Sequence, residues 1–387
     1  MQKQRFFKGL TRDTFLLAAT SFFSDVSTEM LYPLLPIFLT QVLKSPATIV
    51  GIVEGIAEGV QYTIQGFSGY IADKLKNRKR VALVGYALTA LSKPFIGIST
   101  SWQHVLAGRF SDRLGAGIRS APRDALIAAS ADDKSRGKAF GLEGVGDNAG
   151  AVFGPLIAIV LLYYLRVPLR AIFYLAFIPG FIAFTLVFLV KEKKSPVVSK
   201  NNITFSLTRF PKKFWKYMGV IALFGIGNSS NAFLILRAKD IGIPVITTIF
   251  IYAAYNLTAA LSSYPAGNLS DRWGRKNILI LSFLIFVAVY FGFAKSTNIV
   301  LIAFLFILYG IFQGIFRAVG KSQAVDLIPA DLRATGIGIY STVYGVTTLF
   351  ASIVGGQLWD KINPSTTFLY GVATSITATL FLIYNNV

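Results

Sequence analysis

The chain has no cysteine, a single histidine and few charged residues for its length. Without cysteine, disulfide bonds and thiolate metal sites are excluded. Charged residues make up 14% of the sequence, whereas a soluble domain usually carries about 25%. The lone His104 lies beside Trp102 at the start of an apolar stretch, where an interfacial position is expected rather than a role as a ligand. A soluble globular fold is therefore not expected.

Motifs for ATP hydrolysis and for hydrolytic catalysis are also missing. The run Gly320-Lys321-Ser322 lacks the further glycine that a phosphate-binding loop requires, because that position is Ile315. There is no G-x-S-x-G elbow and no H-E-x-x-H pair. These absences disfavour an ATP-driven pump and a membrane enzyme. We predict no catalytic residue, no cofactor and no metal site.

The sequence is instead rich in long apolar runs, and 54% of its residues are hydrophobic. A transmembrane helix needs about 20 such residues. We predict an all-α fold, a polytopic membrane protein with twelve transmembrane helices. They are expected at 13–40, 47–74, 79–100, 102–125, 136–165, 169–190, 214–237, 245–271, 276–295, 297–325, 333–360 and 364–384.

The basic residues, which dominate a net charge of +20, lie mostly between the apolar runs. This placement argues against a nucleic-acid partner. Most of them fall on the side that also carries both chain ends, so the termini are expected in the cytoplasm of a cell-membrane protein. The longest polar connection, 191–213, is basic and is expected to contact anionic lipid. It divides the chain into six-helix halves at 1–190 and 214–387.

Two short motifs recur in the two halves. Gly69 and Asp73 close the second predicted helix, and Gly267 and Asp271 close the eighth, 198 residues later. A second stretch, 117–136, has its counterpart at 314–333. Nearly equal spacing, 198 and 197 residues, on the same side of the membrane predicts two parallel repeats related by an axis along the membrane normal.

These residues resemble motif A of the major facilitator superfamily, G-x-x-x-D-[RK]-x-G-[RK]-[RK]. In the family this motif is implicated in gating between the halves on the cytoplasmic side. Its residues here are Gly69, Asp73, Lys74, Arg78, Gly267, Asp271, Arg272, Gly274 and Arg275. The first copy departs from the pattern, since Lys76 stands where the second glycine belongs. The resemblance covers the whole chain and implies a secondary transporter that works as a monomer.

The fifth predicted helix carries Gly141, Gly150, Gly154 and Pro155. This spacing resembles motif C, which in the family marks drug and metabolite antiporters. The alternative interpretation is close helix packing through small residues, and both can hold together.

Charged residues inside the predicted spans are the candidates for coupling transport to an ion. Charge at membrane depth is costly, so such residues face partners or water, and paired carboxylates in a low dielectric suit a proton carrier. The candidates are Asp25, Glu29, Glu58, Asp112, Arg113 and Asp147. We expect Asp25 to bind the proton, Arg113 to be its electrostatic partner and Glu58 to be second in line. The alternatives are fixed ion pairs that stabilise the bundle, and sodium as the coupling ion.

Seven acids against three bases in the first-half spans favour a cationic or neutral substrate over an anion. The substrate-cavity candidates are Phe23, Tyr32, Arg109, Asn228, Asn231 and Tyr255. We predict proton-coupled efflux of a small amphipathic molecule. A proton- or sodium-coupled nutrient importer is the alternative on the same fold. A membrane receptor or enzyme would need an extramembrane domain or a catalytic constellation, and neither is visible.

Overall fold

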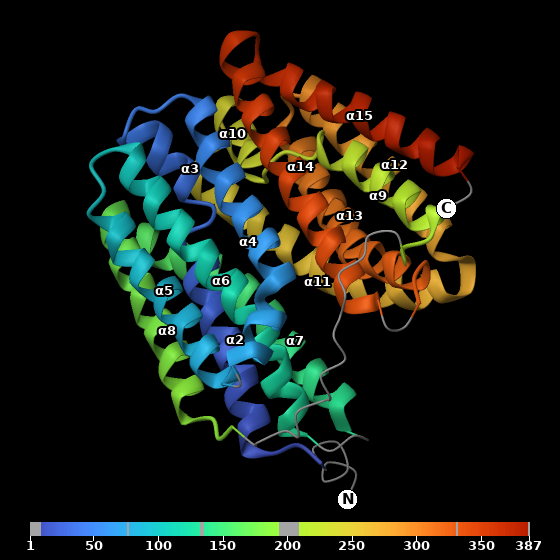
Figure 1. The fold of residues 1–387 in the computed structure, drawn as a ribbon. Coiled ribbons are helices and arrows are strands. Elements are labelled where there is room, and N and C mark those ends of the chain that lie inside the picture. The colour runs from blue at the N-terminus through green and yellow to red at the C-terminus, as the bar shows by residue number, and fades with distance from the viewer. Residues whose placement is uncertain (1–8, 76, 132–134, 193–208, 330–331, 386–387) are drawn as a thin grey trace, which may run out of the picture.

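The computed structural model describes residues 9–75, 77–131, 135–192, 209–329 and 332–385, with the backbone alone at 69–75 and 334. Within these residues every regular element is a helix (Figure 1). The first half contains α2 (Arg12–Glu29), α3 (Leu35–Ile37), η1 (Phe38–Val42), α4 (Ala47–Leu75), α5 (Arg78–Gly97), α6 (Trp102–Ser130), α7 (Arg136–Ile159), η3 (Val160–Tyr164) and α8 (Leu169–Leu189).

The second half repeats this order of elements. It contains α9 (Lys212–Gly225), α10 (Ala232–Asp240), α11 (Val245–Trp273), α12 (Arg275–Lys295), α13 (Ile299–Asp326), α14 (Arg333–Lys361) and α15 (Pro364–Tyr384). Most of the predicted helices lie within a few residues of the observed ones. The predicted linker, 191–213, falls mostly outside the described residues.

The packing of the helices follows the same scheme in both halves. In the first half α2 packs on α7 and α8, and in the second half α9 packs on α14 and α15. Likewise α5 packs on α6 and α8, as α12 packs on α13 and α15. The halves meet along two equivalent seams, α4 against α14 and α11 against α7 (Figure 1). The predicted all-α fold with two parallel repeats is thereby confirmed.

Seven of the described helices combine the length of a membrane span with a mean hydropathy between 1.5 and 2.5. They are α7 with η3, α8 and α11 to α15. The remaining spans include α4, α5 and α6, which carry buried charged side chains. Large apolar side chains such as Phe250, Leu261 and Val300 point outward from the bundle. In a membrane protein this outer surface faces lipid.

Two spans predicted as single helices are broken. The first stops at Glu29 and resumes at Leu35, because Pro33 and Pro36 cannot supply the amide hydrogens of a continuing helix. The seventh is interrupted between α9 and α10, after Gly225. The two breaks meet, since the hydroxyls of Tyr32 and Ser230 share a hydrogen bond of 3.2 Å across a separation of 198 residues. This is the period of the sequence repeat.

The two halves differ in the kind of side chains that are buried in their interiors. The second half has an aromatic core in which Phe224 stacks on Phe283 at 4.3 Å between ring centroids. Phe286 stacks in the same way on Tyr290 at 3.9 Å. The first half contains most of the buried charged side chains. The second half is therefore held mainly by apolar packing, and the first by polar contacts as well.

Two glycines of the motif C-like segment bring α7 against α2. A Cβ atom on Gly154 would lie 2.9 Å from the Glu29 Cβ, and one on Gly150 would lie 2.8 Å from the Asp25 Cβ. Gly141, in contrast, faces open space. Pro155 follows within the same helix and is buried. Close packing therefore accounts for Gly150 and Gly154, but not for Gly141.

We expect Gly154→Leu to force α7 away from α2 and to destabilise the protein by about 1–3 kcal/mol, the usual cost of overpacking. The measurement is the thermal unfolding midpoint of the purified protein in detergent. Gly141→Leu on the same helix is the control and should unfold like the wild type. Equal midpoints for both variants would show that the glycine contact does not hold this pair of helices.

Candidate substrate and proton-coupling cavity

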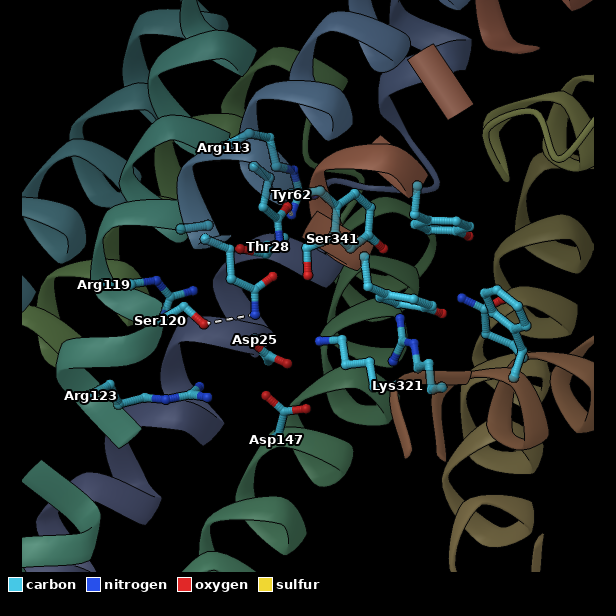
Figure 2. A pocket seen from close by; sticks show the side chains of 18 of the residues that line it. Asp25, Thr28, Tyr62, Arg113, Arg119, Ser120, Arg123, Asp147, Lys321 and Ser341 are labelled. Atoms are coloured by element: carbon cyan, nitrogen blue, oxygen red, sulfur yellow. Dashed lines mark hydrogen bonds between the residues drawn. The ribbon is translucent and has the colours of Figure 1, made fainter. Parts of the chain in front are cut away.

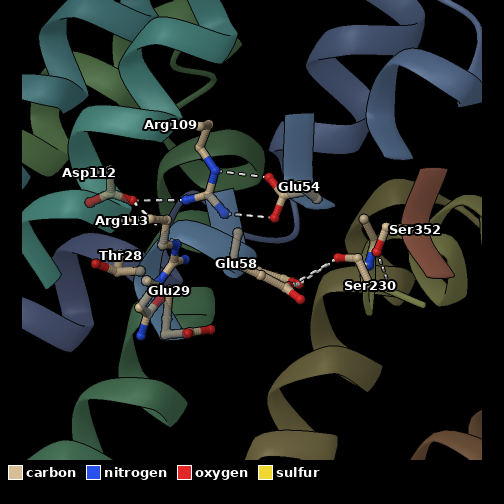
Figure 3. Close-up of polar contacts among 12 residues, drawn as sticks. Thr28, Glu29, Glu54, Glu58, Arg109, Asp112, Arg113, Ser230 and Ser352 are labelled. Carbon is tan, nitrogen blue, oxygen red and sulfur yellow. Dashed lines mark hydrogen bonds and ion pairs between the residues drawn. The ribbon is translucent and has the colours of Figure 1, made fainter. Parts of the chain in front are cut away.

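A buried network of four charged side chains joins α4, α5 and α6, and Figure 3 shows its contacts among Arg109, Glu54 and Asp112. Arg109 donates from Nε and Nη2 to the two carboxylate oxygens of Glu54, at 2.8 and 2.7 Å. Its Nη1 donates to Asp112 at 2.8 Å, and Lys93 donates to the other Asp112 oxygen at 2.8 Å. The four formal charges sum to zero, and bidentate pairing satisfies the guanidinium. The network needs no outside partner.

This network decides the position of two predicted site residues. Asp112 was a proton-coupling candidate and Arg109 a substrate-cavity candidate, yet neither lines the cavity described below. Each is held by two charged partners inside the first half. Sequence reasoning missed the Lys93–Asp112 contact because the two residues are on different helices. The geometry indicates a structural role for both.

A cavity of about 400 Å³ lies between the halves (Figure 2). Four helices of the first half and two of the second form its wall. The lining residues are Asp25, Thr28, Glu29, Gln61, Tyr62, Gln65, Arg113, Ala116, Arg119, Ser120, Arg123, Asp147, Gln313, Phe316, Arg317, Lys321, Tyr340, Ser341 and Tyr344. The wall is mostly polar, which suits a water-filled cavity within a membrane bundle.

The cavity lies toward the face at which α4 ends and α14 begins. At the opposite face the halves are joined, because Asp360 at the end of α14 accepts hydrogen bonds from the backbone of Ala47 and Thr48 at the start of α4. These bonds measure 3.1 and 2.6 Å, and the Thr48 hydroxyl adds a third at 2.6 Å. The positive end of the α4 helix dipole also stabilises the Asp360 carboxylate at this position.

Two carboxylates lie beside each other in the cavity. Asp25 on α2 and Asp147 on α7 point toward one another (Figure 2). Gly150 allows this approach, since it lets the two helices pack closely. Within the described residues neither carboxylate forms an ion pair with a basic side chain. The pair is therefore chemically distinct from the neutral network of Arg109.

Two further predicted acids bridge the halves. Glu29 accepts hydrogen bonds from Tyr252 at 2.9 Å and from Asn256 at 3.3 Å, both on α11. Glu58 accepts from Ser230 at 3.2 Å, at the break between α9 and α10 (Figure 3). Both carboxylates thus hold the second half against the first in this conformation.

Five basic residues also line the cavity. Arg113 donates to Gln61 at 3.2 Å, and its Nε lies 3.7 Å from Asp112. The Arg119 guanidinium lies over the Tyr86 ring at 4.4 Å, and its Nε has no hydrogen-bond partner in the described part of the chain. Arg123 is paired with Asp124 and Glu143, at 2.9 and 3.0 Å. Arg317 and Lys321 come from α13.

The charge of the wall differs from the count on which the expectation of a cationic or neutral substrate was based. The count of seven acids against three bases included Glu54 and Asp112, which are in the closed network, and Glu143, which is paired with Arg123. The lining itself contains three acids and five bases. Arg119, Arg123, Arg317 and Lys321 are lining residues that sequence reasoning missed. The i, i+4 spacing of Arg317 and Lys321 in an otherwise apolar span was a sequence signal by which these two residues could have been found.

The other predicted cavity residues lie behind the wall. Asn231 donates to Tyr255 at 3.0 Å and accepts from Tyr309 at 2.8 Å, and Asn228 donates to Tyr344 at 2.8 Å. Of these residues only Tyr344 lines the cavity. Two predicted aromatics lie elsewhere. Tyr32 bonds to Glu58 and Ser230 at the seam, whereas Phe23 packs against an apolar cluster of the first half.

The second copy of motif A forms a tight turn between α11 and α12. Gly274 has a φ of +85°, a conformation that glycine adopts readily, and Gly267 faces open space. Arg275 bonds to Asp326 of α13 at 2.8 Å and lies 3.7 Å from Asp271. Arg272 is exposed near this turn.

The first copy is described only in part. For Gly69, Asp73 and Lys74 the structure describes the backbone alone. At the start of α5, Glu192 accepts hydrogen bonds from the backbone of Arg78 and Lys79, at 2.9 and 3.4 Å. This carboxylate satisfies free amides of the helix N-terminus.

A bundle of two parallel six-span repeats around a central polar cavity defines the class, a multi-pass membrane transporter rather than an enzyme. The sequence profile of the Major Facilitator Superfamily matches residues 17–236 and 217–386. The chain is also similar to an uncharacterized MFS-type transporter of Methanocaldococcus jannaschii, with 37% identity over 97% of this chain and 95% of the relative. The protein belongs to the major facilitator superfamily, and its substrate is a small molecule.

Two further similarities concern characterised proteins. The multidrug resistance protein MdtG of Klebsiella pneumoniae is 27% identical over 69% of this chain and 67% of its own length. The crystal structure of the nucleoside transporter NupG matches with a TM-score of 0.75 and 16% identity, over 97% of this chain and 99% of that structure. The second likeness shows the fold alone.

Removing Arg109 should leave the buried Glu54 carboxylate without its ion-pair partner and take one of its close cations from Asp112, which keeps Lys93. We expect Arg109→Gln to destabilise the protein by about 3–5 kcal/mol, the range for breaking a buried ion pair. The readout is the unfolding midpoint in detergent. Arg275→Gln removes a half-exposed pair instead and should cost only about 0–1 kcal/mol. A larger loss for the Arg275 variant would contradict a structural role of the network.

Proposed function

We propose that this transporter couples the movement of protons to the export of a small amphipathic molecule. The observation that carries the proposal is the Asp25–Asp147 pair, two adjacent carboxylates in the cavity without a direct cationic partner in the described structure. Two ionised carboxylates this close repel each other in a low dielectric, and binding of one proton by the pair removes that repulsion. Release of that proton changes the charge of the cavity wall by one unit.

The neighbouring cations supply the response to this change. Arg119 and Arg113 are both in the wall, and neither is neutralised by a close, well-aligned ion pair. When the Asp25–Asp147 pair is protonated, these cations are available to other anions. When it is ionised, they are attracted to it. Proton binding can thereby alter both substrate affinity and the balance between conformations.

Alternating access follows from the contacts between the halves. In this conformation Asp360 joins α14 to α4, and Glu29 and Glu58 bind groups of the second half. Opening of the cavity to the other side would require these contacts to break while the halves rock about the seams. Glu29 lines the cavity itself, so it is placed to respond to events there. Asp112 has no such exposure, and its role in coupling remains an untested prediction.

Export is favoured by the motif C-like glycines and by the relative MdtG, a multidrug resistance protein.

The basic loops support cytoplasmic termini in a cell membrane, with the cavity on the cytoplasmic side. We assign the halves to 1–190 and 214–387, joined by 191–213, and expect a monomer to enclose its own pathway. Sodium-coupled transport and nutrient import are the competing functions on the same fold.

The test uses inverted membrane vesicles, in which respiration acidifies the lumen and a fluorescent dye reports the proton gradient. Addition of an exported compound should release protons and restore the fluorescence. A panel of anionic, neutral and cationic amphipathic compounds is added to the wild type and to Asp25→Asn and Asp147→Asn. We expect a response from the wild type that both variants lose, because amide side chains cannot carry the proton.

Asp240→Asn is the matched control, since the exposed carboxylate of Asp240 lies outside the cavity, where it pairs with Arg237. Its response should equal that of the wild type. Undiminished responses in both cavity variants would remove the carboxylate pair from the mechanism. A response that requires sodium would identify sodium, rather than the proton, as the coupling ion. Uptake of a compound under an inward proton gradient, without proton release on export, would establish import.

A further inference from the structure

The second half places two unpaired cations in the wall of the cavity. Arg317 and Lys321 are four residues apart on α13, so they lie on the same side of this helix, and both line the cavity. Neither has a carboxylate oxygen within 4.0 Å among the described residues. Like charges at this spacing repel each other, and charge at membrane depth requires a partner. No direct ion pair therefore neutralises either cation in the described part of the chain.

The carboxylates that interact electrostatically with these cations lie beyond ion-pair distance and belong to the first half: Asp147 and Glu29 for Arg317, and Asp124 for Lys321. The lining of the second half consists otherwise of neutral side chains, namely Gln313, Phe316, Tyr340, Ser341 and Tyr344. The carboxylates of Asp25 and Asp147 belong to the first half and lie beside one another (Figure 2). The carboxylates of the wall are thus on α2 and α7 of the first half, whereas the cations come from both halves, with Arg113, Arg119 and Arg123 on α6 and the Arg317–Lys321 pair on α13.

An aromatic surface adjoins the cation pair. The Tyr344 ring lies 5.4 Å from Phe316 and 5.1 Å from Tyr62, measured between ring centroids. Tyr340 is stacked at 6.5 Å on the other side of Tyr344. A planar or apolar group can pack on such rings while a polar head reaches the cations. The cavity of about 400 Å³ is of the size that holds a small ligand.

We infer that the transported substrate is an organic anion with an aromatic or apolar body. Its carboxylate or phosphate head binds Arg317 and Lys321, and its body packs on the tyrosines of α14. This inference rests on the proposed function in one respect, that the cavity is the transport site. A guanidinium next to an ammonium suits both head groups, because the two cations donate several hydrogen bonds to an oxyanion.

The test measures binding to the purified full-length protein in lipid nanodiscs. The probes share a naphthalene ring and differ in charge: 2-naphthoate, 2-naphthyl phosphate, 2-naphthylmethanol, 2-naphthylmethylammonium and the zwitterion naphthylalanine. Ligand that binds the folded state raises the unfolding midpoint as its concentration increases. We expect one or both anions to bind, with the neutral and cationic probes at least about tenfold weaker. The carboxylate and phosphate arms show which head group is preferred.

Arg317→Gln and Lys321→Gln should each weaken anion binding about tenfold or more. Lys321→Arg keeps the charge and should retain binding, which separates loss of charge from misfolding. Lys295→Gln removes an exposed lysine at the end of α12 and should change nothing. The inference is overturned if no anion binds, if the cationic or zwitterionic probe binds as tightly, or if anion binding survives both glutamine variants.

This binding measurement is independent of proton movement. Anion binding that depends on Arg317 and Lys321, together with proton release insensitive to Asp25→Asn, would retain the substrate class and reject the proposed coupling. Proton release that requires Asp25, without any anion binding, would retain the coupling and reject the substrate class.

Discussion

A charge inside a membrane-embedded bundle needs a partner or contact with water, and this requirement sorts the polar residues of the protein into two groups. In the first, Arg109 and Lys93 neutralise Glu54 and Asp112 at distances of 2.7–2.8 Å, away from the cavity. The second group faces the cavity and has few direct ion pairs. A closed network cannot change its protonation cheaply, whereas groups in contact with water can. The first group therefore stabilises the bundle, and the second is available for transport.

The two halves share one architecture but contribute different charged residues to the bundle and to the cavity. The first half contributes the carboxylates of Asp25 and Asp147 and encloses the neutral network. The second half has an aromatic core and offers the cavity Arg317 and Lys321 among neutral side chains. A substrate bridging the halves would meet both acids and bases on the first half and bases alone among the charged residues of the second. Duplication of the fold has not preserved the chemistry of the wall.

Small residues and carboxylates act together at the helix contacts. Gly150 brings α7 close enough to α2 for Asp147 to meet Asp25, so a packing contact creates the site. Glu29 and Glu58 then use hydrogen bonds to neutral donors of the second half, which are weaker than ion pairs and can be exchanged when the halves move. The same helices therefore provide the stability of each half and the reversible contacts between them.

The sequence alone determined the class of protein, because apolar runs of span length and a repeated motif at one spacing leave few alternatives. It also placed most helix ends within a few residues, since polar loops separate the spans. It failed at Pro33 and near Gly225, where broken helices were predicted as continuous. The proline was visible, but apolar residues on both sides of it masked the break.

The site depended on tertiary structure. The sequence identified Asp25, Glu29, Arg113 and Asp147, all of which line the cavity, because charges in apolar spans are conspicuous. It could not tell these from Asp112, whose partner Lys93 is on a neighbouring helix, and it did not select Arg317 and Lys321 as site residues. Which charges pair and which face water depends on how separate helices pack, and side-chain spacing within one helix does not contain that information.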